Sequence, residues 1–354
     1  MRKIKLIHVG LGRWGSDWAR HVYAASADVE PMGFVDRDPA TLERDRTILR
    51  LPASKFFSRL DDAVASVDAE AVVICLPLPL HAPLAEQALR AGKHVIVEKP
   101  FARTLEEART LVELAQERNL VLMVSQNYRY FSAPRAAAQF SRDEWFGRLN
   151  SVKIDFRHNA PAESYRYWDI PNPLLVDMAV HHYDLMRMVI GEEPVELSCH
   201  AWNPPGSAFE MPPCAVIVLS FPSGVASYRG SWLDQGPKTA WAGEWQMDFE
   251  QGAAFWTSRG DRPNLDRRDR MWIRRLNSES EEIDLVRVPN YDRIGVLAAF
   301  AEAIRAGTEP PFFPSGRDNL STLAIIDATL RSSAAGGASV QVAKPNSAER
   351  GTPF

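Results

Sequence analysis

The sequence predicts an α/β fold: an N-terminal Rossmann domain with a doubly wound parallel sheet, then a C-terminal α+β domain with a large, mostly antiparallel open sheet. A glycine-rich loop follows the first apolar segment, and strands then alternate with helices up to about residue 124. Farther along, strands follow one another largely without helices between them, which favours a separate α+β domain. We therefore divide the chain into residues 1–128, residues 129–340 and a tail, 341–354, that we expect to be disordered.

The first element is an apolar, β-branched segment, residues 4–9, which is typical of a strand buried on both faces. Gly10, Gly12 and Gly15 follow it with G-x-G-x-x-G spacing. The first glycine permits a tight turn, the second lets a pyrophosphate approach the backbone, and the third lets the next helix pack closely on the strand. This pattern predicts a dinucleotide-binding loop.

A helix is expected from Arg13 to about Ala25, and its free N–H groups would point at the phosphates. Arg13 and Trp14 therefore belong to the predicted cofactor site. The next strand, residues 29–35, ends at Asp36, whose carboxylate can bind a ribose diol and repel a 2′-phosphate. NAD is favoured for this reason, but Arg37 could serve a phosphate, so NADP stays open.

The alternation of strands and helices continues through the rest of the first domain. We expect helices at residues 39–50, 60–67, 83–91 and 105–118, and strands at residues 56–57, 71–76, 94–97 and 120–124. Ligands of such sheets lie beyond the carboxyl ends of the strands. Pro77, His81, Glu98 and Lys99 follow two of these strands and are therefore expected to line the same cleft as the glycine loop.

The second domain is predicted to be rich in strands. They are expected at residues 149–157, 195–201, 215–221, 225–232, 246–250, 253–257, 271–275 and 283–288, with helices at 174–190, 294–305 and 319–333. One face of this sheet has no evident covering helix, and it is rich in tryptophan and phenylalanine. Such a face is often an interface, so we predict a homodimer or homotetramer formed through this sheet.

Composition limits the class of protein. The formal net charge of −4 and the pI near 6.1 give no reason to expect nucleic acid or a membrane surface as a partner. Cys75, Cys199 and Cys214 show neither a disulfide framework nor metal-ligand spacing, which favours a reducing compartment and no metal. With no apolar run of membrane-spanning length and a strand from residue 4, we expect a cytoplasmic protein.

Two groups of residues could carry chemistry. Lys99 follows Glu98 at the end of a buried strand, where a partly desolvated ammonium can neutralise a developing alkoxide; a surface ion pair is the alternative. Asp177, His181 and Asp184 are spaced i, i+4 and i+7, which places them on one helical face. The carboxylate one turn away can orient the imidazole as a general base, although a buried histidine with only a core role is the alternative.

Four segments resemble the glucose–fructose oxidoreductase / inositol dehydrogenase / rhizopine catabolism (Gfo/Idh/MocA) family. They are the glycine loop 9–15, the strand 72–77 with His81 after it, the segment 91–100 that ends in Glu-Lys-Pro, and the D-x-x-x-H-x-x-D helix. The resemblance implies a Rossmann domain that holds NAD(P) and a second domain with a large open sheet. Sugars or cyclitols would be the substrates.

The resemblance also implies Lys99, Asp177 and His181 as the catalytic set for hydride transfer from a secondary hydroxyl. His181 would take the hydroxyl proton, Lys99 would stabilise the oxygen, and Asp177 would orient the imidazole or bind an adjacent hydroxyl, with no metal required. We choose His181 over His182 because it stands one turn from Asp177. Two other functions on this fold stay open: an NAD-dependent glycosidase with transient oxidation, and a non-catalytic regulator that senses NAD or a sugar.

Further candidates lie outside these motifs. Asn127 and Arg129 correspond to a family segment at the domain junction, which implies a cofactor contact for Asn127 and a substrate contact for Arg129. Tyr165 and Trp168 lie in a polar loop before the D-x-x-x-H-x-x-D helix, and aromatic faces stack well on sugars. A purely structural role is the alternative for each of these residues.

Overall fold

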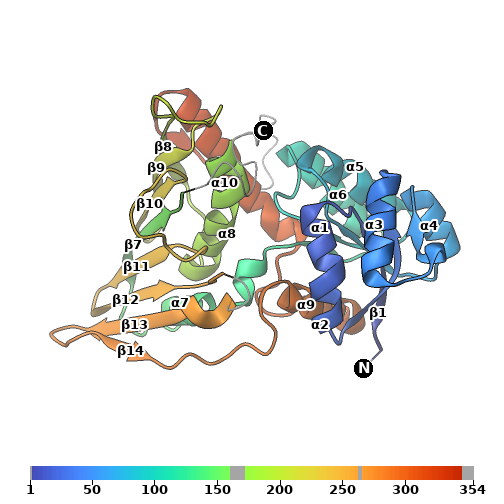
Figure 1. Ribbon diagram of the computed structural model, residues 1–354. Helices are drawn as coiled ribbons and strands as arrows, with labels where there is room; N and C mark the ends of the chain where they lie inside the picture. Colours follow the sequence, from blue (N-terminus) through green and yellow to red (C-terminus); the bar gives the residue numbers. More distant parts are fainter. Residues whose placement is uncertain (1, 160–171, 262–264, 345–354) are drawn as a thin grey trace. The chain divides into compact units, whose positions relative to one another are not determined.

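The computed structural model describes residues 2–159, 172–261 and 265–344 (Figure 1). It divides into two compact units, the first of which contains Met1–Asn127 and Arg293–Leu320. The second unit contains Tyr128–Asp292 and Ser321–Phe354. The segment Arg293–Leu320 therefore lies with the first unit, although the sequence-based ranges assign it to residues 129–340. Most of the tail predicted at 341–354 lies outside the described residues.

The first unit is built on a six-stranded parallel sheet, as predicted. Its order is β3-β2-β1-β4-β5-β6, and its strands are β1 (Ile4–Val9), β2 (Val29–Val35), β3 (Phe56–Phe57), β4 (Ala71–Ile74), β5 (His94–Val97) and β6 (Leu122–Val124). The side chains of β4 are buried along its whole length, because helices cover both faces of such a sheet. The strand order reverses between β1 and β4, and such a switch point is where open α/β sheets bind ligands.

Helices connect the strands of this sheet. They are α1 (Arg13–Asp17), η1 (Trp18–Val22), α2 (Tyr23–Ala25), α3 (Pro39–Leu49), α4 (Leu60–Ser66), α5 (His81–Arg90) and α6 (Leu105–Glu117). The predicted helix from Arg13 to Ala25 is thus formed by α1, a π-helical turn and α2 in succession. The helix α9 (Asp292–Ala306) contributes all but its first residue to this unit.

The second unit is built on a nine-stranded sheet that is mostly antiparallel, as predicted. Its order is β14-β13-β12-β11-β7-β10-β9-β8-β15, and its strands are β7 (Leu149–Arg157), β8 (Glu196–Trp202), β9 (Cys214–Ser220), β10 (Val225–Ser231), β11 (Glu244–Phe249), β12 (Gly252–Thr257), β13 (Arg270–Arg275), β14 (Glu281–Ile283) and β15 (Val340–Gln341). β10 pairs with β7 in parallel and with β9 in antiparallel orientation. The helices of this unit include α7 (Ser132–Arg142), η6 (Pro173–Met178), α8 (Ala179–Ile190) and the larger part of α10 (Gly316–Ala334).

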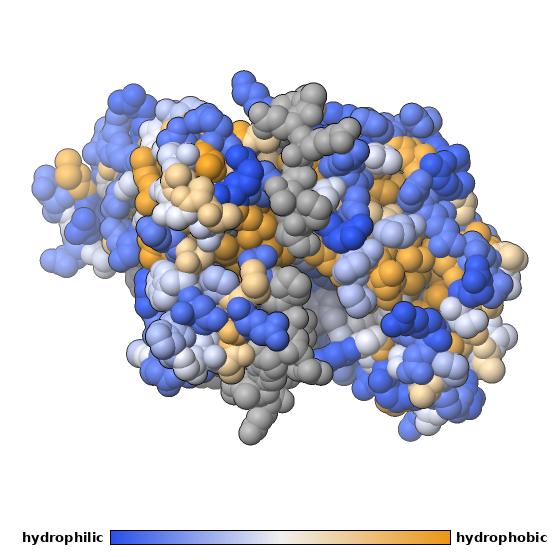
Figure 2. Space-filling view, turned by 90° about the horizontal axis from the view of Figure 1, so that it is seen from above, coloured by the Kyte–Doolittle hydropathy of each residue, from blue (hydrophilic) through white to orange (hydrophobic). Residues whose placement is uncertain are grey.

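Figure 1 shows α8 and α10 beside one face of this sheet. Side chains alternate accordingly along β11, where Trp245, Met247 and Phe249 are buried and the residues between them are more exposed. Within the described residues, no helix is long and apolar enough to cross a membrane. On the surface drawn in Figure 2, hydrophobic residues show as small groups among hydrophilic ones.

Candidate active site

The glycine loop has the backbone geometry that its spacing predicts. Gly10 has φ +96°, and a Cβ there would overlap the carbonyl oxygen of Cys75 at the end of β4. A Cβ at Gly15 would overlap the carbonyl oxygen of Gly10. A Cβ at Gly12 would have no atom of the described residues within 4 Å, so this part of the chain does not require glycine there. The open space beside Gly12 fits the close approach of a pyrophosphate.

A buried histidine of β1 forms a hydrogen bond with the backbone of this loop. The Nε2 of His8 donates to the carbonyl oxygen of Gly10 at 2.7 Å, and its Nδ1 accepts from the hydroxyl of Tyr23 at 2.7 Å. Burial lowers the pKa of His8 to about 4, so the ring is neutral and can make both bonds at once. His8 was not predicted as a site residue. It lies in an otherwise apolar strand, and nothing in that pattern indicates that its side chain bonds to the glycine loop.

Asp36 lies at the end of β2 and is tied to the glycine loop. Its carboxylate accepts from the backbone N–H of Leu11 at 2.7 Å and of Asp38 at 3.0 Å. The carboxylate therefore lies beside the loop, and its predicted contact with an adenosine ribose stays a prediction. Arg37 and Arg13 are exposed, and their predicted contacts with a cofactor stay predictions.

Glu98 links the glycine-loop helix to the segment after β5. Its Oε1 accepts from the indole N–H of Trp14 at 2.9 Å and of Trp18 at 2.8 Å, and its Oε2 lies 3.3 Å from the backbone N of Lys99. Glu98 is buried, so these bonds compensate for its desolvation. The carboxylate thus fixes the backbone from which the Lys99 side chain extends; its predicted contact with a cofactor stays a prediction.

Arg293, which was not predicted, completes this cluster. Its guanidinium carbon lies 4.0 Å from the Trp14 ring centroid and 5.3 Å from that of Trp18, and it pairs with Asp17. Arg293 comes from the start of α9, and no spacing in the sequence connects it with the glycine loop. Cation–π contacts of this kind stabilise a buried guanidinium.

His81 connects the segments that follow β4 and β5. It is buried, with Nδ1 2.7 Å from the carbonyl oxygen of Pro100 and Nε2 2.7 Å from that of Leu76. Burial lowers the pKa of His81, while the two carbonyl groups act in the opposite direction. Pro77 precedes the short turn that leads to His81. Together with Trp14–Glu98, these contacts bring the three predicted cofactor segments to one edge of the sheet.

In the second unit, His181 is held against an aromatic ring. Its imidazole stacks on the ring of Tyr128, with 4.0 Å between centroids and 5° between planes. Asp177 lies half-buried in η6, the turn just before α8. Burial raises the pKa of Tyr128 to about 12; the charges of Asp292 and Asp177 add to this rise and Arg259 opposes it. Asp177 and His181 therefore both lie near Tyr128.

The two adjacent histidines of α8 differ in their surroundings. His182 is buried, with Nε2 3.0 Å from the carbonyl oxygen of Trp241 and Nδ1 3.2 Å from the hydroxyl of Tyr228. Burial lowers its pKa to about 4. His182 thus has the contacts of a core histidine, which leaves His181 as the candidate base.

The remaining predicted residues fall into three groups. Arg129 is buried and donates two hydrogen bonds of 2.6 Å to Asp184, so its guanidinium holds the segment 127–130 on α8. Asn127 is buried at the start of this segment. Tyr165 and Trp168 lie outside the described residues. The substrate contacts expected of Arg129, Tyr165 and Trp168 stay predictions.

Arg259 is a further residue that sequence reasoning missed. Its guanidinium carbon lies 4.7 Å from the Tyr128 ring centroid and 5.7 Å from that of Trp241. Its φ of +59° is in the left-handed region, which is uncommon for a non-glycine residue. Arg259 lies two residues after the end of β12, and only the folded chain brings it to Tyr128.

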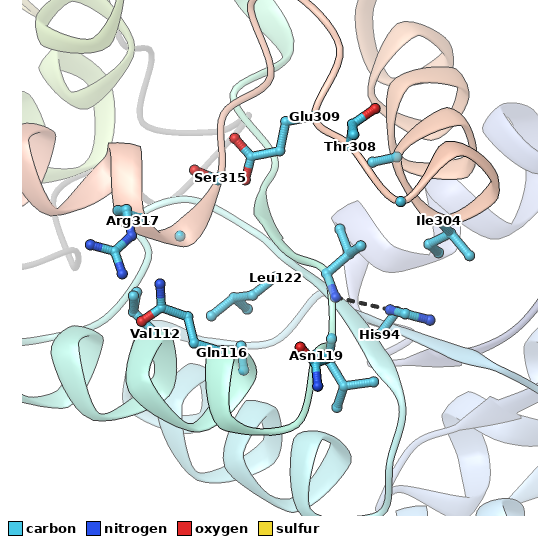
Figure 3. A pocket seen from close by; sticks show the side chains of 16 residues that line it. His94, Val112, Gln116, Asn119, Leu122, Ile304, Thr308, Glu309, Ser315 and Arg317 are labelled. Carbon is cyan, nitrogen blue, oxygen red and sulfur yellow. Dashed lines mark hydrogen bonds between the residues drawn. The ribbon is translucent and has the colours of Figure 1, made fainter.

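Two pockets within the units are lined by residues other than these candidates. Figure 3 shows a pocket of about 360 Å³ in the first unit, lined by residues that include His94, Gln116, Glu309 and Arg317. It lies at the amino ends of β5 and β6, the opposite edge of the sheet from the glycine loop. The other, of about 510 Å³, lies on the second unit's sheet. Among the described residues, no group of three or more histidine, cysteine, aspartate or glutamate residues could hold a metal ion.

The glycine loop, the six-stranded parallel sheet and Asp36 define a dinucleotide-binding Rossmann unit. Residues 4–126 match a family model described as an oxidoreductase family with an NAD-binding Rossmann fold, and residues 135–255 match a GFO/IDH/MocA C-terminal domain. The chain is 30% identical over 345 residues to an inositol 2-dehydrogenase of Rhizobium meliloti, which covers 92% of this chain and 95% of the relative. It therefore belongs to the GFO/IDH/MocA oxidoreductase family, and the predicted NAD(P)-dependent oxidoreductase is confirmed.

Solved structures share this fold. An aldose–aldose oxidoreductase from Caulobacter crescentus, complexed with glycerol, has a TM-score of 0.82 at 21% identity, with 96% of this chain and 100% of that chain covered. The WlbA dehydrogenase from Bordetella pertussis, in complex with NADH and UDP-GlcNAcA, has a TM-score of 0.79 at 20% identity, with 97% and 100% covered. At these identities the likeness shows the fold alone.

Proposed function

We propose that the protein is an NAD-dependent dehydrogenase that oxidises a secondary hydroxyl of a sugar, a sugar derivative or a cyclitol. The observation that carries the proposal is the similarity to an inositol 2-dehydrogenase along 92% of the chain. The presence of Lys99, Asp177 and His181 supports it, because oxidation of an alcohol needs a proton acceptor and a group that stabilises the oxygen.

Residues 1–128 would hold the cofactor and residues 129–340 the substrate. Gly10, Gly12, Gly15 and the N-terminus of α1 fit a pyrophosphate, and the carboxylate of Asp36 fits a ribose diol better than a 2′-phosphate. When bound, NAD supplies the hydride acceptor. NADP is the alternative cofactor.

Residues of the chain itself would accept the hydroxyl proton and stabilise the negative charge that develops on the oxygen. His181 takes the proton, since a neutral imidazole is a suitable acceptor near neutral pH. Lys99 donates a hydrogen bond to the same oxygen and stabilises its negative charge. Asp177 orients the imidazole or binds an adjacent hydroxyl. The proposal includes a cytoplasmic location, supported by the free thiols of the cysteines.

The test is a screen of myo-inositol, sugars and other polyols with NAD⁺ and with NADP⁺ at alkaline pH, following nicotinamide absorbance. Lys99→Ala and His181→Ala should each lower turnover by roughly 10²- to 10⁴-fold while NAD⁺ still binds. Lys5→Ala, which removes an exposed lysine paired with Asp68, is the matched control. Undiminished turnover in both site variants would contradict the mechanism. Product formed without net reduction of NAD⁺ would indicate the glycosidase alternative, and NAD⁺ binding without any turnover would indicate the sensor.

A further inference from the structure

The stack of Tyr128 on His181 lies inside the second unit. Tyr128 is 3% exposed and His181 is 6% exposed. With 4.0 Å between centroids and 5° between planes, the two rings are stacked nearly parallel. Rotation of the imidazole about its Cβ–Cγ bond would drive its edge into the phenol ring. This contact therefore fixes the plane of the imidazole.

Neighbouring contacts hold the Tyr128 ring itself in place. The next residue, Arg129, makes a buried ion pair with Asp184, which lies three residues after His181 on α8. The segment 127–130 and α8 are thus joined by two adjacent contacts. Arg259 adds a cation 4.7 Å from the Tyr128 ring centroid.

The kind of contact that holds an imidazole decides whether its ring nitrogens can still act as a base. His182 shows that this helix can also fix an imidazole by hydrogen bonds at both ring nitrogens. A ring stack acts on the face of the imidazole and engages neither nitrogen. Stacking is therefore a way to orient a histidine whose nitrogen must exchange a proton with substrate.

A direct acid–base role for Tyr128 fits the structure less well than a positioning role. Burial raises the pKa of the Tyr128 hydroxyl to about 12, so the phenol is neutral over the working range and cannot act as a phenolate base. Its ring is the part that contacts His181.

We propose that Tyr128 is a positioning residue that fixes the plane of the His181 imidazole through its ring, independently of its hydroxyl. This inference rests on the proposed role of His181 as the base. Tyr128→Phe should preserve this function and Tyr128→Leu should remove it. Phe140→Leu is the matched control, because it also removes a contact between two buried aromatic rings in the second unit, that of Phe140 with Phe146 at 5.8 Å between centroids.

The first readout needs no substrate. In protein labelled with ¹³C and ¹⁵N at histidine, the His181 signals, assigned with His181→Gln, should be shifted upfield by the ring current of a parallel neighbour. The shift should persist in Tyr128→Phe and Phe140→Leu and disappear in Tyr128→Leu. An unchanged His181 shift in folded Tyr128→Leu would overturn the proposal.

The second readout is turnover with myo-inositol and NAD⁺ as probes. Tyr128→Leu should lower kcat roughly tenfold to a hundredfold with little change in the KM for NAD⁺, while Tyr128→Phe stays close to the parent. Equal losses in both variants would assign the effect to the hydroxyl and overturn the proposal. If no sugar or polyol of the screen is turned over, or His181→Ala keeps full activity, the proposed function fails while the ring-current measurement still decides the positioning role.

Discussion

Burial keeps several histidines of this chain neutral. The pKa values of His8, His158 and His182 are each lowered to about 4, with burial as the largest cause. For His182, the hydrogen bond to Trp241 acts against burial but does not outweigh it. These rings bond their neighbours as neutral imidazoles, and protonation would break that arrangement.

The consequence is a loss of stability in mild acid. An unfolded histidine takes up a proton near pH 6.5, whereas His182 in the folded chain does so only near pH 4, so the unfolded state binds more protons between these values. Stability should therefore fall as the pH falls from 6.5 to 4, by roughly 3 kcal/mol for a fully buried ring. Urea unfolding at a series of pH values measures this slope.

His182→Gln removes one of these groups and should make the slope of unfolding free energy against pH shallower. His21→Gln, at a mostly exposed histidine, is the control and should leave the slope as in the parent. A slope in His182→Gln equal to that of the parent would contradict this account of His182.

Some candidate site residues are visible in the sequence because their spacing is local. Gly10, Gly12 and Gly15 follow from one short motif. The pairing of Asp177 with His181 was predicted from α-helical periodicity, whereas the structure has Asp177 in the π-helix η6 and His181 in α8, so the pairing stays a prediction. Tyr128 and Arg259 could not be found in this way, since their contacts join segments that are distant in the sequence. The ring stack depends on tertiary packing, for which a single chain gives no periodic signal.

We expect two glycines of the loop to be needed for different reasons: Gly10 for the fold of the first unit and Gly12 for binding the cofactor. A methyl group at Gly10 would meet the carbonyl of Cys75 and would also strain a positive φ, so Gly10→Ala should destabilise the first unit. A methyl group at Gly12 would meet no atom within 4 Å among the residues that the structure describes. Gly12→Ala should therefore leave thermal unfolding of the apoprotein unchanged and weaken NAD⁺ binding at least tenfold, because a Cβ blocks the pyrophosphate.

Thermal melts and isothermal titration with NAD⁺ on both variants check this expectation. Gly224→Ala, at a glycine whose Cβ would overlap the carbonyl oxygen of Asn150 in the second unit, is a control that should destabilise without a specific loss of NAD⁺ affinity. Full NAD⁺ affinity in Gly12→Ala would show that the loop does not carry the pyrophosphate.

Helices and strands were predictable where the residues that begin and end them lie next to them in the sequence. The helix α7 was missed: its first N–H groups, from Ser132 and Ala133, are capped by the carboxylate of Asp269, at 2.8 and 2.9 Å. A cap supplied from so far along the chain leaves no signature near Ser132. The strand expected at residues 283–288 was also wrong in extent, because β14 ends at Ile283, opposite Met271 near the start of its partner β13.

At the scale of the molecule, the chain passes between its units more often than a contiguous division allows. Asp292 belongs to the second unit and its charge bears on Tyr128, whereas Arg293, the next residue, belongs to the first unit and contacts Trp14. Both lie at the start of α9. Helical periodicity predicts that α9 exists, but it cannot show that consecutive residues serve different units.

The outer face of the nine-stranded sheet leads to the prediction of a homo-oligomer. Val216 and Val218 on β9 and Val225 on β10 are 42%, 42% and 45% exposed, although β-branched residues usually pack against a neighbour. On the same face, the ion pairs of Asp155 with Arg157 and Arg229 neutralise charge across β7 and β10. A surface with exposed apolar side chains and internally compensated charge is suited to self-association.

We therefore expect sedimentation at micromolar concentration to show a dimer or tetramer. The double variant Val216→Glu, Val218→Glu should dissociate it while the circular dichroism spectrum stays native, because both side chains already face outward and the new carboxylates would repel one another across a two-fold interface. Leu276→Glu, at a 66% exposed residue just after β13, should leave the assembly intact. A parent protein that sediments as a monomer would refute the interface. A double variant that stays assembled would place the interface elsewhere, because burying two like charges on each subunit costs more free energy than a standard interface provides.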